Sequence, residues 1–323
     1  MHARHRLTLA ALGTLTLAAA GCGSAAPAAQ SPTQVSVAYA GSLAYVNDRQ
    51  LAPVFTRQTG IAYRGQGGGS FGIARELAAG ALKADVFESL GEKPITILEP
   101  RLTRWSVSLA ASPLVIAYNP RSPYAPYFRQ VAAGRRSLAG LFRFLATHPG
   151  VHLGRTNPAT DPQGQAFYEM VELAVRQYHL PAGDPAAILG AWNNPRQVFS
   201  EEGILTQLQA GGLDLASAFL PEAKQRHLPY IPLPATLNFS DPALASWYGS
   251  ATVPLPSGPV HGGPLAVVAT VLHNSRAGTR YLAFLLSARG RRILTANGYP
   301  AITPAIYGDR AAVPAAVREE IRP

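Results

Sequence analysis

Apolar and polar positions follow two alternating periods along the chain, which indicates that strands and helices succeed one another. Residues 35–39 alternate as a strand does, and a turn of small residues at 40–42 leads into helically spaced apolar positions up to Gly60. The order then repeats with a strand at 61–64, a glycine-rich turn at 65–70, a helix at 71–82 and a strand at 85–87. This succession predicts an α/β domain with a parallel sheet.

The alternation continues beyond residue 100 without an internal repeat of about 20 to 50 residues, which argues against a solenoid. The segment 254–259 reads Pro-Leu-Pro-Ser-Gly-Pro and is interpreted as a linker. The expected elements are strands at 113–118, 151–153, 213–219 and 264–273, and helices at 138–147, 165–178, 202–210 and 278–297.

Composition indicates a folded chain rather than a disordered one. The protein has 323 residues, of which 47% are hydrophobic, so two domains of about 100 to 200 residues are expected. Only 14% of the residues are charged, although the formal net charge is +10. The basic residues are dispersed, so the charge is interpreted as a solvated surface that attracts anions and not as a nucleic-acid interface.

The N-terminus has the pattern of an export signal. A basic segment at 2–6 precedes an apolar run at 7–20, and small residues lead directly to Cys22, the only cysteine of the chain. A lone cysteine excludes a disulfide framework and a four-thiolate zinc site. No other stretch reaches the ~18 apolar residues that a membrane span requires.

The sequence before Cys22 resembles the extended lipobox of bacterial lipoproteins. This resemblance implies that residues 1–21 are a signal peptide, that cleavage leaves Cys22 as the lipidated N-terminus, and that the protein is tethered to a membrane. A plain signal peptide is the alternative. Residues 22–34 lack large apolar side chains and are interpreted as a flexible tether.

Three turns carry the candidate chemistry, each at the end of a strand and the start of a helix. They contain Ser42, the run from Gly67 to Ser70, and the run from Asp161 to Gly164. Helix N-termini present unpaired N–H groups, so such turns can hold an anion. Ordinary capping is the alternative, because serine is a frequent N-cap and Asp161-Pro162 is a common N-cap and N1 pair.

Signatures of other functions are weak or absent. Residues 67–72 satisfy G-x-G-x-x-G, but the run follows the second strand and not the first, so it is interpreted as an anion-holding turn and not as a dinucleotide site. No metalloprotease, P-loop or nucleophile-elbow motif is present. His148 and His152 cannot share a helix face, because Pro149 and Gly150 lie between them. We therefore expect no enzyme, no cofactor and no side-chain metal centre.

Several segments together resemble the molybdate/tungstate-binding proteins of ABC importers, especially the tungstate-type branch. The likeness covers roughly residues 35–305, and its most specific part is the run GRTNPATDPQG at 154–164. The segments are VAYAGSL at 37–43, the Gly69-Ser70 turn, KADV at 83–86, LVIAY at 114–118, the run at 154–164 and FLLSARG at 284–290.

The resemblance implies an α/β protein with two lobes and a hinge, of the type II-like periplasmic-binding-protein architecture. Lobe 1 would comprise residues 35–110 and 260–323, and lobe 2 residues 111–259. The ligand would be a tetrahedral oxyanion, and the partner a membrane permease of an ABC importer. A binding protein for sulfate or phosphate, or an exported enzyme on the same fold, are the alternatives.

Matching motifs carry the binding site onto this sequence. Ser42, Gly69 and Ser70 would belong to one lobe, and Asp161, Gln163 and Gly164 to the other. The tungstate-type branch uses two carboxylates that raise the coordination of the metal from four to six. Where the second is expected the sequence has Ala218, and Gln163 replaces a common cysteine. The sequence therefore predicts a four-coordinate oxyanion.

Asp161 is predicted to cap a helix or to support residues that contact the ligand, without binding the ligand itself. A carboxylate ~4 Å from a like unit charge costs ~4 kcal/mol at an effective dielectric constant of ~20. Neutral donors suffice for binding, because hydrogen bonds to charged groups contribute ~1.5 to 3 kcal/mol each and micromolar affinity needs ~8 kcal/mol.

Overall fold

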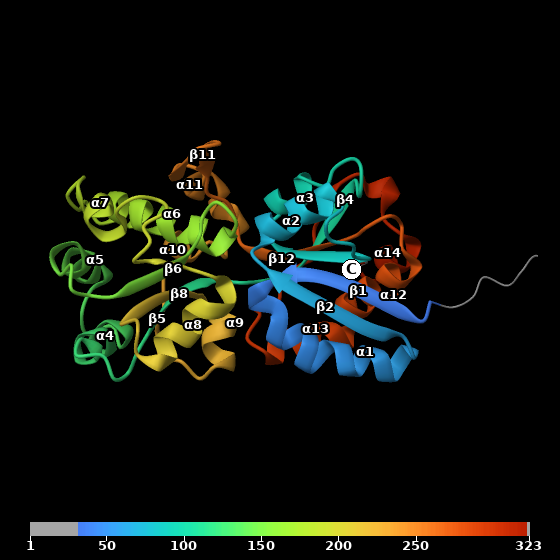
Figure 1. Cartoon of the computed structure of the whole chain (residues 1–323), viewed down its shortest axis with the longest axis horizontal. Helices are drawn as coiled ribbons and strands as arrows, with labels where there is room; N and C mark the ends of the chain where they lie inside the picture. The colour runs from blue at the N-terminus through green and yellow to red at the C-terminus, as the bar shows by residue number, and fades with distance from the viewer. Residues whose placement is uncertain (1–31, 322–323) are drawn as a thin grey trace, which may run out of the picture. The chain divides into compact units, whose positions relative to one another are not determined.

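Two large β-sheets organise residues 32–321, the part of the chain that the computed structural model describes (Figure 1). The predicted signal peptide, Cys22 and most of the predicted tether lie outside the described residues. In spatial order, the strands of the first sheet are β13 (Ile306–Gly308), β4 (Trp105–Ala111), β12 (Ala266–Val271), β3 (Val86–Leu90), β1 (Gln34–Ala40) and β2 (Ala62–Gly68).

The first sheet is mixed. Strand β1 runs parallel to β2 and β3, as the sequence predicts, but β12 pairs antiparallel with both β3 and β4. The predicted parallel pairing is therefore confirmed for β1, β2 and β3, whereas β4, β12 and β13 extend the sheet with antiparallel pairs. Their order along the chain explains this, because β4 and β12 are separated by the whole of the second sheet and β12 does not follow a β-α-β crossover.

The second sheet contains β7 (Val198–Phe199), β6 (Leu153–Thr156), β8 (Leu215–Phe219), β5 (Leu114–Tyr118) and β9 (Tyr230–Ile231), in this order. The chain enters it within two residues of the end of β4 and returns to the first sheet at β12. The interpretation of residues 254–259 as a linker is wrong, because β10 (Thr252–Leu255) and β11 (Gly258–His261) form a hairpin there.

Helices follow the strands in both halves. Those near the first sheet are η1 (Gly41–Leu43), η2 (Val46–Leu51), α1 (Ala52–Thr59), α2 (Ser70–Ala79), α3 (Lys93–Thr96), α12 (Arg276–Leu286), α13 (Ala288–Ala296), η4 (Arg310–Ala312) and α14 (Ala315–Glu320). The others are α4 (Ala125–Ala132), α5 (Leu138–Thr147), α6 (Pro162–Gln177), α7 (Asp184–Leu189), α8 (Glu201–Ala210), α9 (Leu220–Gln225), α10 (Ala235–Asn238), η3 (Pro242–Leu244) and α11 (Ala245–Tyr248).

The glycine-rich segment after the second strand is mostly strand and not turn. Strand β2 extends to Gly68, so only Gly69 separates it from α2. A Cβ at Gly65 or Gly67 would lie 2.7 or 2.8 Å from the ring of Tyr39. The glycines therefore let the buried Tyr39 ring lie against β2. Helix α2 ends at Ala79, earlier than predicted, because Gly80 adopts a left-handed φ of 75°.

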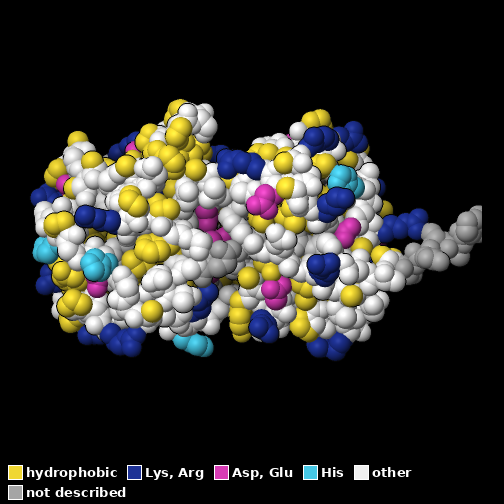
Figure 2. All heavy atoms as spheres, viewed as in Figure 1, with side chains coloured by type: hydrophobic (Ala, Val, Ile, Leu, Met, Phe, Trp, Pro, Cys, Tyr) yellow, Lys and Arg dark blue, Asp and Glu magenta, His cyan; other side chains and the backbone are white. Residues whose placement is uncertain are grey.

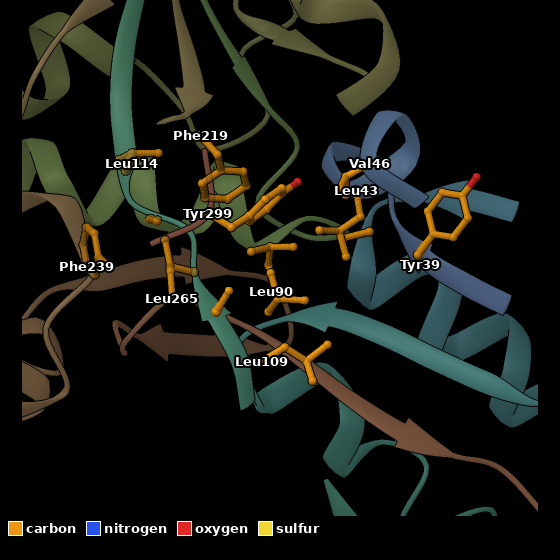
Figure 3. Close-up of a cluster of buried hydrophobic side chains, with 14 of the residues drawn as sticks. Tyr39, Leu43, Val46, Leu90, Leu109, Leu114, Phe219, Phe239, Leu265 and Tyr299 are labelled. Carbon is orange, nitrogen blue, oxygen red and sulfur yellow. The ribbon is translucent and has the colours of Figure 1, made fainter. Parts of the chain in front are cut away.

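One hydrophobic cluster connects the two sheets (Figure 3). It contains Leu43 and Leu90 from the first half and Leu114 and Phe219 from the second, all at most 1% exposed. Tyr299 belongs to the same cluster, and its hydroxyl donates to the carbonyl of Ser42 at 3.1 Å. The packing of Leu43 in this cluster and the hydrogen bond from Tyr299 therefore hold the turn at the end of β1 in place.

Within residues 32–321, no helix combines the length and the apolar character needed to cross a membrane. Figure 2 shows Lys and Arg side chains scattered over the visible face of the described residues, without one continuous basic patch.

Candidate anion-binding site

The turn at the end of β1 holds a carboxylate. Gly41 and Ser42 are the first residues of η1, so their N–H groups have no partner within the helix. The Gly41 N–H donates to Oε2 of Glu201 at 2.8 Å, and the Ser42 N–H donates to Oε1 at 2.9 Å. Both oxygens of one carboxylate are therefore bound by the two adjacent amides of a turn that the sequence predicts as an anion site.

Glu201 comes from the other half of the molecule. It is the first residue of α8. The helix is capped by Ser200, whose hydroxyl accepts from the Gly203 N–H at 3.1 Å. The Glu201 side chain is 5% exposed. Burial raises its pKa well above the ordinary value, and Asp161 and Glu222 raise it further, whereas hydrogen bonds from Ser42 lower it.

Asp161 caps α6. Its Oδ1 accepts from the Gln163 N–H at 2.8 Å, and Pro162 occupies the first helical position. Asp161 is 3% exposed, and its charge raises the pKa of both Glu201 and Glu222. Three acidic side chains therefore influence one another electrostatically at this place.

The side chain of Gln163 points into a buried network behind the cap. Its Nε2 donates to Oε2 of Glu222 at 3.0 Å, and its Oε1 accepts from the Ser217 hydroxyl at 2.8 Å. The Phe219 N–H donates to the same Glu222 oxygen at 2.9 Å. Burial raises the pKa of Glu222 to about 7, although these hydrogen bonds and Arg226 lower it.

The second predicted turn also faces the other half. The N–H groups of Phe71 and Gly72, at the start of α2, donate to the Thr160 carbonyl at 3.0 and 3.2 Å. A Cβ at Gly69 would lie 2.6 Å from that carbonyl oxygen, so only glycine permits this approach. Ser70 is fully buried and does not cap α2. Its Oγ accepts from the Leu90 N–H at 3.3 Å, so the hydroxyl can still donate a hydrogen bond.

A cavity of about 350 Å³ lies among these elements, and we call it the acidic cavity. Of the six predicted site residues, Gly69 and Asp161 line it, and Ser42 contacts its Glu201 wall. Ser70, Gln163 and Gly164 do not line it. Gly164 serves packing, because a Cβ there would overlap the Thr156 carbonyl. The lining residues are Gly69, Thr156, Asn157, Thr160, Asp161, Val198, Phe199, Ser200 and Glu201.

Two carboxylates of this region were missed from the sequence. A second acidic side chain was sought at position 218, but Ala218 is buried in β8, and Asp214 accepts from the Ser122 hydroxyl and the His152 N–H. Glu201 and Glu222 supply acidic groups from different helices. Glu201 could have been noticed in the sequence only because it follows Ser200, a serine at the predicted start of a helix. Among the described residues, no group of three or more His, Cys, Asp or Glu side chains could hold a metal ion.

Solved structures resemble this fold. The periplasmic molybdate-binding protein of Azotobacter vinelandii aligns with a TM-score of 0.55 and 17% identity, over 83% of this chain and 99% of that one. The sulfate-binding protein SubI of Mycobacterium tuberculosis aligns with a TM-score of 0.50 and 14% identity, over 89% of this chain and 90% of that one. These likenesses confirm the predicted α/β fold of periplasmic binding proteins, and at such identities they show the fold alone.

Sequence relatives extend over nearly the whole chain. A protein of Haloferax volcanii that is named for molybdenum binding by an ABC transporter is 31% identical over 302 residues, 93% of this chain and 91% of that protein. The molybdate/tungstate-binding protein WtpA of Pyrococcus abyssi is 24% identical and covers 86% of this chain. The family model of bacterial extracellular solute-binding proteins matches residues 35–300. The chain therefore belongs to the family of bacterial extracellular solute-binding proteins, a class that binds solutes and is in general not enzymatic.

Proposed function

We propose that this protein captures a tetrahedral oxyanion, molybdate or tungstate, outside the cytoplasm and delivers it to the permease of an ABC importer. The observation that carries the proposal is the buried carboxylate of Glu201 on the amides of Gly41 and Ser42. A turn that binds two oxygens of a carboxylate presents donors of the kind that an oxyanion needs. The names of the Haloferax and Pyrococcus relatives support the choice of molybdate or tungstate.

In the proposed binding step, the oxyanion displaces Glu201 from the two amides. The hydroxyls of Ser42 and Ser70 add donors, Gly69 permits close approach, and Asp161 remains the cap of α6. Gln163 and Gly164 act by holding Asp161 and the start of α6 in place.

The bound anion keeps four-coordinate geometry in this proposal. Asp161 already uses Oδ1 as a helix cap, and Ala218 contributes no carboxylate. X-ray absorption on the molybdate complex measures the coordination number directly. Four oxygen neighbours support the proposal, whereas six would show that Asp161 or Glu201 bonds to the metal.

Titration calorimetry of the purified mature chain with molybdate, tungstate, sulfate and phosphate tests the function. We expect micromolar or tighter binding of molybdate or tungstate, which corresponds to about 8 kcal/mol. Stronger binding of sulfate or phosphate would identify another anion as the solute. No binding of any of the four anions would contradict an oxyanion function.

Closure of two lobes accompanies binding in this proposal, because the residues that border the acidic cavity come from both halves. Gly69 lies in the first half, and Thr160 and Asp161 lie in the second. Small-angle scattering with and without molybdate measures the change. We expect a smaller radius of gyration with ligand, and an unchanged value at saturation would argue against closure.

Cys22 carries a lipid anchor in this proposal, so that the binding protein stays near its permease. The sequence around Cys22 supports the anchor. The variant Cys22→Ala should appear in the soluble fraction, and its continued association with membranes would contradict lipid anchoring.

A further inference from the structure

A second, larger cavity of about 660 Å³ shares no lining residue with the acidic cavity. It lies beside Phe71 of α2 and Pro162 of α6, whereas the acidic cavity lies beside Gly69 and Asp161, so the contact between α2 and the loop before α6 separates the two. Figure 2 shows the surface hollowed at its upper edge, between the β11 and α11 side and the α2 and α3 side of Figure 1.

Most of the wall of this apolar cavity is hydrocarbon. Its volume is within the range of about 300 to 1,000 Å³ that is typical of small-molecule sites. Apolar walls with few polar groups are the usual composition of such sites. The main apolar contributors are Leu90, Pro94, Ala166, Leu265, Val268 and Ile302.

A buried carboxyl group lines the apolar cavity. Glu169 of α6 is 2% exposed, and its Oε1 has no hydrogen-bond partner. A Cβ at Gly262 would lie 3.1 Å from Oε2 of Glu169, so the segment after β11 lies against the carboxyl group. Burial raises the pKa of Glu169 well above its ordinary value. An unsatisfied buried oxygen of this kind destabilises the fold unless a partner binds it.

Lys93, at the start of α3, supplies the opposite charge. Its ammonium group donates to the His261 carbonyl on β11, and it is exposed to solvent on one side. Burial lowers the pKa of Lys93, and the charge of Glu169 partly offsets that lowering. The charge of Lys93 likewise opposes the rise that burial causes in the pKa of Glu169. In the described part of the chain, however, no ion pair within 4.0 Å joins them. The two charges therefore border the same cavity without neutralising each other by contact.

We propose that the apolar cavity binds a small zwitterion with an apolar side chain, of the amino-acid type. Its ammonium group donates to Glu169, its carboxylate accepts from Lys93, and its side chain packs against the hydrocarbon wall. An amine without a carboxylate would leave Lys93 without an acceptor from the ligand. A fatty acid would leave Oε1 of Glu169 unsatisfied. This site shares no lining residue with the acidic cavity.

Three probes with one phenyl body test the proposal: phenylalanine, phenethylamine, which lacks the carboxylate, and 3-phenylpropionate, which lacks the amine. Calorimetric titration of the mature chain should show the tightest binding for phenylalanine. Glu169→Gln and Lys93→Met should each weaken phenylalanine binding about tenfold or more, because each removes a charge-assisted hydrogen bond. Cooperative thermal unfolding of each variant verifies that it is folded.

Two exposed residues provide matched controls, Glu76→Gln on α2 and Lys83→Met after it, neither of which lines the cavity. Both should bind phenylalanine as the unmodified protein does. The proposal is overturned if phenylalanine binds no more tightly than the other two probes. It is also overturned if the folded Glu169 and Lys93 variants bind phenylalanine as the controls do. Failure of molybdate to bind would affect the oxyanion proposal alone.

Discussion

Glu201 and Glu169 are both buried carboxyl groups that face the first sheet from helices of the second half, yet their surroundings differ. Glu201 has an amide N–H on each oxygen, whereas Oε1 of Glu169 has no partner. Burial of a carboxyl group therefore does not by itself define a binding site. The arrangement of donors distinguishes a site that holds an internal anion from a cavity that lacks a polar partner.

The groups that oppose the rise in pKa also differ between Glu201 and Glu169. Burial is the largest cause for both residues and raises both pKa values. Hydrogen bonds from Ser42 oppose this rise at Glu201, whereas only the charge of Lys93 opposes it at Glu169. Glu201 is therefore stabilised by directed donors and Glu169 by a charge at longer range.

Replacing each carboxyl group by leucine should shift stability in opposite directions. Glu201→Leu leaves the amides of Gly41 and Ser42 without acceptors and should lower the free energy of unfolding by about 2 to 4 kcal/mol. Glu169→Leu removes an unsatisfied oxygen and should raise it by about 1 kcal/mol or leave it unchanged. Urea denaturation measures both. Equal losses in the two variants would contradict the comparison.

The free energy of unfolding should depend on pH through the titration of Glu222, the acidic residue whose charge influences Glu201. Burial raises the pKa of Glu222 from 4.5 to about 7. Folding therefore favours its protonated form, so this contribution is complete below about pH 4.5 and is lost as the pH rises through 7. The loss is at most about 3 to 4 kcal/mol, which corresponds to a pKa difference of about 2.5 units.

Glu222→Gln should remove this part of the pH dependence, because the amide does not titrate and can still accept from Phe219. Thermal unfolding between pH 4.5 and 8 gives both curves. If the variant and the unmodified protein lose stability equally over this interval, the raised pKa of Glu222 is not the cause.

Weakening the internal anion should strengthen oxyanion binding. A glutamine at 201 presents only one acceptor oxygen to two amides, so it competes less with the ligand. We expect Glu201→Gln to bind molybdate about tenfold more tightly, which corresponds to about 1.4 kcal/mol. Glu169→Gln is the matched control and should leave molybdate affinity unchanged. Weaker binding by Glu201→Gln would indicate that Glu201 is itself a ligand.

The smallest expected effect concerns single side-chain donors. Ser42→Ala removes one hydroxyl but keeps the backbone amide, so molybdate affinity should fall about two- to fivefold, or ~0.5 to 1 kcal/mol. Asp161→Asn should be mild or favourable, since an amide oxygen still caps α6 and a negative charge is removed. A loss beyond about a hundredfold in Asp161→Asn would assign Asp161 to the metal.

Local sequence signals predicted the parts of the fold that depend on nearby residues. Helix α5 begins and ends where the apolar period predicts, and the cap of α6 follows from Asp161-Pro162. The start of β5 agrees within one residue. These features depend on interactions between residues a few positions apart, which the sequence displays directly.

Features that depend on distant contacts were not predictable in the same way. The glycines of β2 make room for the Tyr39 ring on the neighbouring strand β1. This contact is not visible in the local sequence, where a run of glycines is typical of a turn. Glu201 reaches Gly41 across 160 positions of the chain. No local pattern encodes that approach. The sequence therefore indicated the turn at 40–42 as a candidate, but not the Glu201 carboxylate that its amides bind.

A crystal structure of the molybdate complex, with anomalous diffraction at the molybdenum edge, tests whether the anion replaces Glu201 on the amides. We expect one anomalous peak at the start of η1, with oxygens of the anion within hydrogen-bond distance of the Gly41 and Ser42 N–H groups. The Glu201 carboxylate should have left those amides. A peak elsewhere, or a Glu201 carboxylate still bound to both amides beside the anion, would contradict the claim.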